Sequence, residues 1–549
     1  MKKITYVLIF ALVGAVFTSC NNGQGEQKEE KQEKTEMQKK LDNYAEVELN
    51  ADLLHLSPEQ REMLGILIDV ADIMEEIFWM EAIAPKHEFL SKIEDEATKA
   101  YAKINYGPWD RLNGNKPFIE GYGEKPPGAQ FYPEDITKEE FENWDNENKD
   151  SWYTIVRRDA EGKLMNIWYH EFFNEKIMEA ADLLEAAAEL EENPGFKKYL
   201  DLRAEAFRTD EYLDSDLAWM EMEGNKIDFV VGPIESYEDQ FMGYRAAHSG
   251  QLLIKDIEWS EKLTHFGELM PELQASLPVP AEYKQEKART EANMNVYEVI
   301  YYAGDCNAGG KNIAINLPND PRVHEAKGSR KLQLKNAMQT KFDKILVPIS
   351  DMLIVEEQRE NISFKAFFEN VMFHEVSHGL GVKQTITGDG SVRNALKDAY
   401  SPVEEAKADI TSLYLLTQLH NMGELPESVL KDNYVTFLAG IFRSIRFGIS
   451  SAHGQANMME FNYLKDSGAF ERTDEGQYKI NFEKMKEVVT DLSGYIITLQ
   501  GDGNYEEAKN WIEEKAQVGE TLQSDIDRIN EAGIAKDIVF KQGKDVLDL

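Results

Sequence analysis

Cysteine is almost absent from this chain of 549 residues, which contains two cysteines, Cys20 and Cys306. A fold held together by disulfides is excluded, because Cys20 lies at the end of an N-terminal leader and leaves Cys306 without a partner. Long apolar runs are also scarce. The clearest covers residues 4–17, and it is too short to span a bilayer. The chain must therefore be stabilised by its own cores, and its length and 42% hydrophobic content suit two or more subdomains.

Basic side chains are outnumbered, with 60 against 100 acidic ones, and the formal net charge is −40. A field of this sign repels nucleic acid and anionic lipid, so neither is expected as a partner. A solvated acidic surface accounts for the charge without a specific ligand. The sequence does not indicate an oligomeric state.

The N-terminus is typical of an exported protein. Lys2 and Lys3 precede the apolar run, as in a signal peptide, which we place at residues 1–19. Its end, Phe-Thr-Ser-Cys, is similar to a bacterial lipobox in which Cys20 is lipidated; a plain cleavage site is the alternative. Residues 20–40 are nearly free of apolar side chains and are expected to form a disordered tether. We therefore expect a lipid anchor to a bacterial envelope membrane, on its periplasmic face or the cell surface.

The strongest functional signal is a His-Glu-x-x-His motif, His-Glu-Val-Ser-His, at residues 374–378. Apolar residues recur at spacings of three and four across residues 363–380, which predicts a helix. On one helical face, His374 and His378 can bind a single Zn²⁺, and Glu375 lies where a general base that activates water must lie. The apolar flanks indicate a buried helix, which favours a metal site over a solvated face with two histidines.

A catalytic zinc needs a third protein ligand and an open position. The metzincin pattern fails, because Gln384 occupies the position of its third histidine. Residues 401–416 predict a second helix, and Glu404 and Glu405 at its start both qualify by position. Glu405 is favoured, because Asp409 lies one turn further on the same face and can accept the second N–H of a ligating histidine. An acidic first turn that only favours the helix dipole is the alternative.

Taken together, these motifs and three further segments resemble the dipeptidyl peptidase III family of zinc peptidases, in a form with the five-residue zinc motif. The family's motif commonly carries one more residue, as His-Glu-x-x-Gly-His. Its second zinc motif is similar to residues 404–409, and the resemblance again selects Glu405 as the ligand. The matches stand in the family's order: residues 232–237 (Gly-Pro-Ile-Glu-Ser-Tyr), 316–319 (Asn-Leu-Pro-Asn), 404–409 (Glu-Glu-Ala-Lys-Ala-Asp) and 452–456 (Ala-His-Gly-Gln-Ala).

The resemblance implies a role for each matched residue outside the zinc motifs. Glu235 is implied to hold the free amino group of the substrate, and Asn316 and Asn319 to bind the N-terminal part of the peptide. Tyr237 and His453 are implied to stabilise the transition state at the scissile carbonyl.

We therefore expect a zinc-dependent exopeptidase, with one zinc ion per chain, that releases dipeptides from the N-terminus of oligopeptides. A zinc aminopeptidase or endopeptidase of another cut is one alternative. A non-catalytic lipoprotein that binds peptides or zinc is another, but Glu375 argues against it, because binding does not need a general base.

Most of the chain predicts helices, with strands near residues 153–169 and 227–234. The resemblance implies an α+β, predominantly helical fold with two lobes around a wide cleft. The zinc is expected on the helical lobe and a small β-barrel in the other. The expected mixed α/β lobe covers residues 41–255 and 300–345, and the helical zinc lobe covers residues 256–299 and 346–549.

Overall fold

The computed structural model describes residues 34–284, 294–388 and 390–549. The expected signal peptide at residues 1–19 and the expected lipidation site Cys20 lie outside these described residues. No helix in the described ranges combines the length and the apolar character needed to cross a membrane.

The tether expected at residues 20–40 ends earlier than predicted, because α1 (Glu36–Leu41) is helical. A capping box between Thr35 and Gln38 satisfies the first N–H groups of this helix. Lys40 also pairs with the buried Asp110 at 3.2 Å, which docks α1 on the body of the protein. The polar composition of the expected tether could not reveal this docking contact, and residues 20–33 lie outside the described residues.

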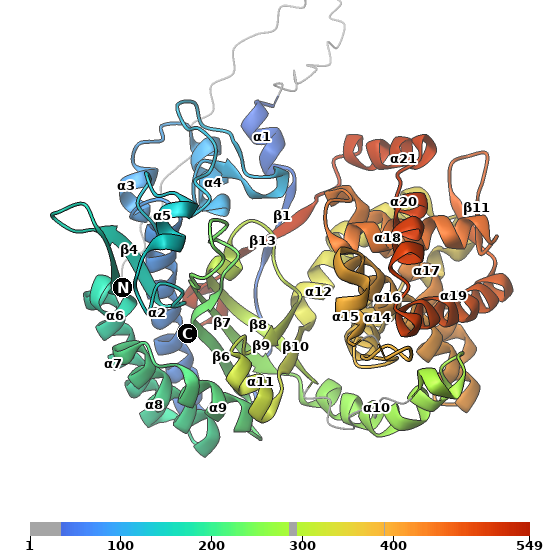
Figure 1. Ribbon diagram of the computed structural model, residues 1–549, viewed down its shortest axis with the longest axis horizontal. Helices are drawn as coiled ribbons and strands as arrows, with labels where there is room; N and C mark the ends of the chain where they lie inside the picture. Colours follow the sequence, from blue (N-terminus) through green and yellow to red (C-terminus); the bar gives the residue numbers. More distant parts are fainter. Residues whose placement is uncertain (1–33, 285–293, 389) are drawn as a thin grey trace, which may run out of the picture.

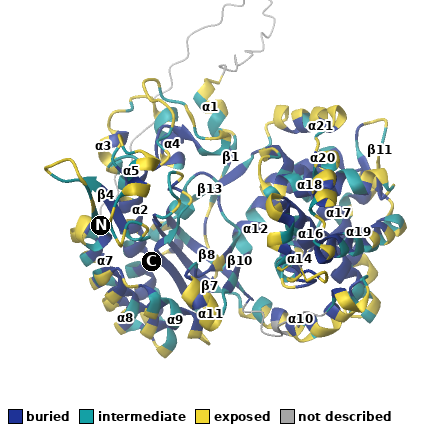
Figure 2. Cartoon of the chain, in the orientation of Figure 1, coloured by how far each residue is buried: buried dark blue, intermediate teal, exposed yellow. Residues whose placement is uncertain are grey.

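The chain folds into two lobes that lie side by side (Figure 1), as the expected two-lobed, predominantly helical α+β fold requires. Each lobe has its own apolar core. The first core draws on residues 49–254, 297–337 and Leu547, and the second on residues 263–296 and 338–538. Figure 2 shows buried residues inside both lobes and exposed residues on the outer helices.

The first lobe is built around a five-stranded sheet in the order β6-β7-β8-β10-β9. The pair β8–β10 is parallel and the other pairs are antiparallel. Helix α2 packs across β7 and β8, with α7 and α8 outside it. The elements of this lobe are β1 (Tyr44–Glu48), α2 (Pro58–Ala82), α3 (Lys86–Leu90), α4 (Glu96–Asn105), β2 (Trp109–Asp110), β3 (Lys116–Pro117), α5 (Lys138–Asn143), β4 (Thr154–Arg158), β5 (Leu164–Trp168), α6 (Tyr169–Phe172), α7 (Asn174–Leu190), α8 (Pro194–Thr209), α9 (Leu213–Glu221), β6 (Ile227–Glu235), β7 (Ala247–Lys255), β8 (Met294–Gly304), β9 (Ala314–Leu317), α11 (Pro321–Lys327) and β10 (Arg330–Leu334).

The expected β-barrel is not formed by the described strands, because β6 and β9 are the two edges of the sheet rather than partners. The free edge of β9 matters for function, since an edge strand offers unpaired N–H and C=O groups to an extended peptide. Local sequence explains where the helix that supports this sheet begins: Ser57 caps α2 and Pro58 is its first residue.

The second lobe is helical, and α16 lies at its centre. Helices α14, α17, α18 and α19 pack around α16, which explains why α16 is apolar on nearly every side. The elements of this lobe are α10 (Ile257–Ser276), α12 (Lys335–Lys341), α13 (Val347–Leu353), α14 (Phe364–Ser377), α15 (Val392–Leu396), α16 (Tyr400–Met422), α17 (Glu427–Ser444), α18 (Ala452–Asp466), β11 (Phe470–Arg472), β12 (Tyr478–Ile480), α19 (Phe482–Asp502), α20 (Tyr505–Lys515) and α21 (Glu520–Glu531).

The expected lobe boundaries differ from the two cores at three places. Strand β8 begins at Met294, so the sheet starts before residue 300. The first core ends at Ala337 rather than residue 345. After the helical lobe the chain returns: β13 (Asp537–Lys541) pairs in parallel with β1, and α22 (Lys544–Leu547) packs on the first core.

Candidate functional site

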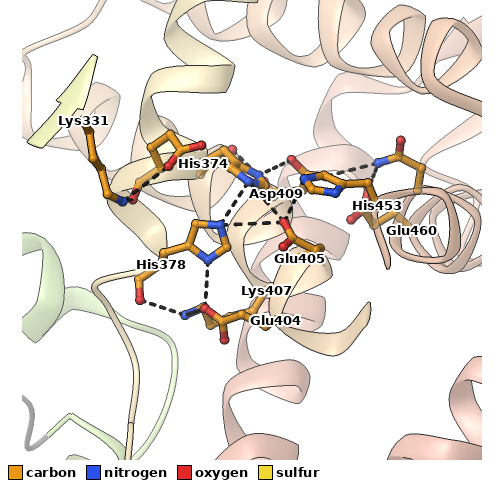
Figure 3. Close-up of polar contacts among 12 residues, drawn as sticks. Lys331, His374, His378, Glu404, Glu405, Lys407, Asp409, His453 and Glu460 are labelled. Carbon is orange, nitrogen blue, oxygen red and sulfur yellow. Dashed lines mark hydrogen bonds and ion pairs between the residues drawn. The ribbon is translucent and has the colours of Figure 1, made fainter. Parts of the chain in front are cut away.

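Helices α14 and α16 bring the three predicted ligands together. His374 lies in the last turn of α14, His378 caps its end, and Glu405 lies in the second turn of α16. The two imidazole Nε2 atoms are 3.2 Å apart, and Glu405 Oε2 lies 3.4 Å from the first and 3.7 Å from the second. One donor atom from each of the three residues therefore lies within 4.8 Å of the other two (Figure 3).

The outer nitrogen of each imidazole is already engaged. The Nδ1 atom of His374 lies 2.7 Å from Asp409, as predicted, and that of His378 lies 2.9 Å from Glu404. A carboxylate at Nδ1 keeps the proton there and leaves the Nε2 lone pair directed at the centre of the cluster. The outer carboxylates thus favour the tautomers that metal ligation requires.

Glu404 is held by two further side chains. Lys407 lies 2.7 Å from its Oε1, and Gln500 of α19 donates to its Oε2 at 2.8 Å. Burial would raise the pKa of Glu404, but Lys407 and His378 lower it to about 2. Glu404 is therefore ionised and fixed before any ligand arrives.

The charge of Glu405 also suits a cation. Burial raises the pKa of this carboxyl, but the three histidines around it lower the pKa below its ordinary value. Its Oε2 atom is buried, and three imidazole Nε2 atoms lie 3.2–3.7 Å from it without forming a hydrogen bond of normal geometry. A buried carboxylate oxygen that no hydrogen bond satisfies is costly, and a divalent cation bound by two imidazoles and this oxygen removes the cost. The donor set fits such an ion.

A second row of polar residues lies behind Asp409. Asn457 donates to its Oδ2 at 3.2 Å and to Oε2 of the fully buried Glu460 at 3.4 Å. Burial and the adjacent Asp409 raise the pKa of Glu460 well above its ordinary value. Both residues come from α18, and Asn457 holds Asp409 against His374.

His453 and Glu375 complete the site in the second lobe. His453 opens α18, its Nε2 atom lies 3.2 Å from Glu405 Oε2, and its side chain is 64% exposed. A cavity of about 250 Å³ is lined by His374, Glu375, His453 and, from the first lobe, Ala314. A reacting group in this cavity would contact the ligand cluster, the predicted base and the predicted oxyanion donor together.

Glu235, Asn316 and Asn319, which are predicted to bind the N-terminus of the substrate and are called the amino clamp below, lie in the first lobe. Together with Tyr237 they line a cavity of about 740 Å³. Asn319 donates to Glu235 at 3.0 Å. The register of β6 shifts between Pro233 and Glu235, a bulge that turns the carboxylate out of the ladder. Burial raises the pKa of Glu235, so this carboxylate gains from a cationic partner.

The structure therefore gathers the predicted site residues into two groups rather than one. Ala314 of β9 lines both cavities, so the cavities are neighbours. Tyr237 is 76% exposed, and none of the described contacts joins it to the histidine cluster. Its predicted role at the scissile carbonyl requires the lobes to approach each other.

Sequence reasoning missed three residues at this site. Glu404 was considered only as an alternative metal ligand to Glu405. Its position next to Glu405 is the signal for a carboxylate that hydrogen-bonds to the Nδ1 atom of His378. Glu460 lies two helical turns from His453 on α18, a pattern without a metal signature. Lys331 of β10 contacts Glu375 from the other lobe, and no local pattern reports a contact between strands and helices far apart in sequence.

Comparison with known proteins agrees with this geometry. The model of peptidase family M49 matches residues 144–429, more than half of the chain. A dipeptidyl peptidase III structure from Caldithrix abyssi superimposes with a TM-score of 0.88 and 40% identity, covering 92% of this chain and 99% of that one. A dipeptidyl-peptidase III structure from Corallococcus sp. strain EGB gives a TM-score of 0.77 and 32% identity, covering 92% and 96%.

A protein of Arabidopsis thaliana named Nudix hydrolase 3 is 32% identical over 568 residues, which cover 91% of this chain and 73% of the plant protein. Its name refers to a different class of hydrolase. The family match and both solved structures agree on a peptidase, and they are similar to this chain across the ligand cluster as well as the sheet.

Proposed function

The chain belongs to peptidase family M49, and from this premise we propose that it is a zinc-dependent peptidase that releases dipeptides from the N-terminus of oligopeptides. It is a metallopeptidase. The predominantly helical two-lobed fold and both structural relatives support the dipeptidyl peptidase activity.

Zinc is the metal that the donor set favours, with His374, His378 and Glu405 as ligands and one ion per chain. Two imidazoles and one carboxylate with an open position are a common catalytic zinc site. We expect His378→Ala to lose most of its metal by elemental analysis. His420→Ala, which changes a histidine of α16 that contacts the Leu425 carbonyl at 2.9 Å and lies outside the ligand cluster, is the matched control and should keep it.

When bound, zinc supplies Lewis acidity that makes water a nucleophile near neutral pH and polarises the scissile carbonyl. Glu375 accepts the proton of the attacking water and later delivers it to the leaving amine. His453, and Tyr237 once the lobes approach, donate hydrogen bonds to the oxyanion that develops at the carbonyl. Asp409 keeps His374 in its ligating tautomer.

The substrate path follows β9. Its free edge pairs with an extended peptide, whose ammonium group meets Glu235 and Asn319 at one end while Asn316 contacts the first residues. The peptide then passes Ala314 into the cavity that contains Glu375. Because the amino clamp holds the N-terminus of the peptide at a fixed distance from Glu375, the cleaved bond is set by its distance from that N-terminus.

The observation that carries this proposal is the cluster of His374, His378 and Glu405 beside Glu375, in a chain of family M49. The test is digestion of one octapeptide with a free and with an acetylated N-terminus, with products identified by mass. We expect dipeptides from the free peptide and little cleavage of the acetylated one. Equal rates would indicate an endopeptidase, and single amino acids an aminopeptidase.

We further propose that the mature protein is anchored by lipid at Cys20, since a lipobox-like segment ends the apolar leader. Cys20→Ser should move the protein from the membrane fraction to the soluble exported fraction, or leave it unprocessed. Cys306→Ser is the control and should remain with the membrane. A correctly cleaved Cys20→Ser protein that stays on the membrane would remove the anchor.

A further inference from the structure

The amino clamp and the catalytic centre lie on different lobes, so the distance between them depends on how the lobes contact each other. The amino clamp is on the sheet of the first lobe, whereas Glu375 is on α14 of the second. Release of a dipeptide requires the clamp and the catalytic centre to stay two extended residues apart, roughly 7 Å along the peptide. A displacement of about 1 Å costs on the order of a hundredfold in rate. A contact that ties the strands of the clamp to Glu375 would hold this spacing and with it the cleavage register.

Lys331 makes such a contact. Its Nζ donates a hydrogen bond to the backbone carbonyl of Glu375 at 2.7 Å and lies 3.4 Å from the Oε2 atom of the same residue. Figure 3 shows Lys331 reaching from a strand toward the helix that carries His374. One side chain of the first lobe thus holds both the main chain and the carboxylate of the predicted base.

The carbonyl that Lys331 binds is an unsatisfied helix end. Continuation of α14 would bring the N–H of Gly379 to the Glu375 carbonyl, but this N–H donates to Val376 instead, at 2.9 Å. The last carbonyls of a helix lack internal partners and carry the negative end of its dipole, so a lysine there is favourable. Lys331 therefore caps, from the opposite lobe, the helix that carries the zinc motif.

The strand end of the contact leads directly to the clamp. Lys331 on β10 is paired with Asn316 on β9 in an antiparallel ladder. Residues directly opposite in such a ladder point to the same face, with Cβ atoms about 5 Å apart. The side chain that holds Glu375 and the side chain predicted to bind the N-terminal part of the peptide are therefore cross-strand neighbours.

We propose that Lys331 is a positioning residue that sets the dipeptide register, by tying the peptide-binding strand pair β9–β10 to the helix end and the carboxylate of Glu375. The proposal rests on the proposed function. Lys331 exchanges no proton and acts on the reaction only through Glu375. It keeps the base at one distance from the clamp, so that the second peptide bond is the one presented for cleavage.

The test compares Lys331→Met, which keeps the apolar stem, with Lys331→Arg, which keeps a cationic donor. Lys327→Met is the matched control, because Lys327 of α11 pairs with Glu221 within the first lobe, at 3.1 Å. Metal content and circular dichroism are measured for every variant. Kinetics use a tetrapeptide with a free N-terminus, and product lengths come from mass spectra of a digested octapeptide.

We expect Lys331→Met to keep its metal and fold, to lose roughly tenfold or more in kcat with KM changed less than about threefold, and to release products other than dipeptides. Lys331→Arg should restore kcat to within about threefold and restore the dipeptide register. Lys327→Met should match the wild type.

Three results would overturn the proposal: wild-type kcat with dipeptides alone from Lys331→Met, loss of metal together with activity, or no rescue by Lys331→Arg. The second would reduce Lys331 to a structural cap of α14. Failure of the proposed function would look different, because the wild-type enzyme itself would then release no dipeptides.

Discussion

Glu375 is the proposed general base, because it is the carboxylate of the motif at residues 374–378 and does not belong to the proposed ligand cluster. We expect Glu375→Gln to keep its metal and to lose about a hundredfold or more in kcat, since an amide cannot accept a proton from water. Glu357→Gln, at an exposed carboxylate paired with Lys479, is the control. A fall in kcat of less than about tenfold would exclude Glu375 as the base.

Glu235 is the residue that gives the clamp its charge. Removing it leaves the substrate ammonium without a counter-ion in a half-buried cavity, where a hydrogen bond to a charged group contributes about 1.5–3 kcal/mol. Glu235→Ala should therefore raise KM for free peptides about 10- to 100-fold and narrow the difference from acetylated peptides. Glu221→Ala on the surface of the same lobe is the control. An unchanged ratio between free and acetylated peptides would place the ammonium elsewhere.

Single residues also show how far sequence reasoning reaches. The motif at residues 374–378 predicted a metal cluster because helical spacing alone determines that two imidazoles share a face, and the structure brings them within 3.2 Å. Glu235, Asn316 and Asn319 have no such local signature. Only the resemblance to a family singled them out, because the sheet that assembles them joins strands distant in sequence.

At the scale of elements, helix α16 contributes two successive side chains, Glu404 and Glu405, to the candidate metal site. On α16, Glu405 points at the ligand cluster, while Glu404 turns to the outer nitrogen of His378 and is held by Lys407 and Gln500. Adjacent helical residues lie about 100° apart, so both cannot face the same atom. The burial of α16 on nearly every side makes this division possible.

The division predicts unequal effects for two neighbouring substitutions. Glu405→Gln removes a ligand and should abolish stoichiometric metal binding. Glu404→Gln disturbs only the support of His378 and should weaken metal affinity about 10- to 100-fold. Competition with a chromophoric chelator measures both affinities. Equal losses, or a greater loss in Glu404→Gln, would exchange the roles of the two glutamates.

Helices were easier to predict than strand order for a physical reason. The periods of α14 and α16 arise within each segment, because one face packs on a core, and the predicted helices therefore match the observed ones closely. The pairing of β8 with β10 and of β1 with β13 depends on segments brought together only by folding. Their sequences carry no mark of the partner, so the open sheet and the returning C-terminus were missed.

At the scale of the whole molecule, the two apolar cores contribute unequally to the proposed metal site. All three proposed ligands come from α14 and its C-cap and from α16, which belong to the second lobe. The first core contributes the clamp, and β13 returns to it from the second lobe. Metal binding therefore stabilises one lobe directly and reaches the other only through the contacts between them.

This asymmetry makes the effect of metal removal local. A ligand that binds only the folded state at a thousand times its dissociation constant adds about 4 kcal/mol to stability, and chelation removes that amount. Hydrogen exchange followed by mass spectrometry should therefore accelerate in peptides from α14 and α16 after chelation, while peptides from α2 and β7 change little. Glu405→Gln supplies the control, since chelator should not alter its exchange. Equal acceleration in both lobes would show that the two cores unfold as one unit. It would contradict the prediction that metal binding stabilises the second lobe alone directly.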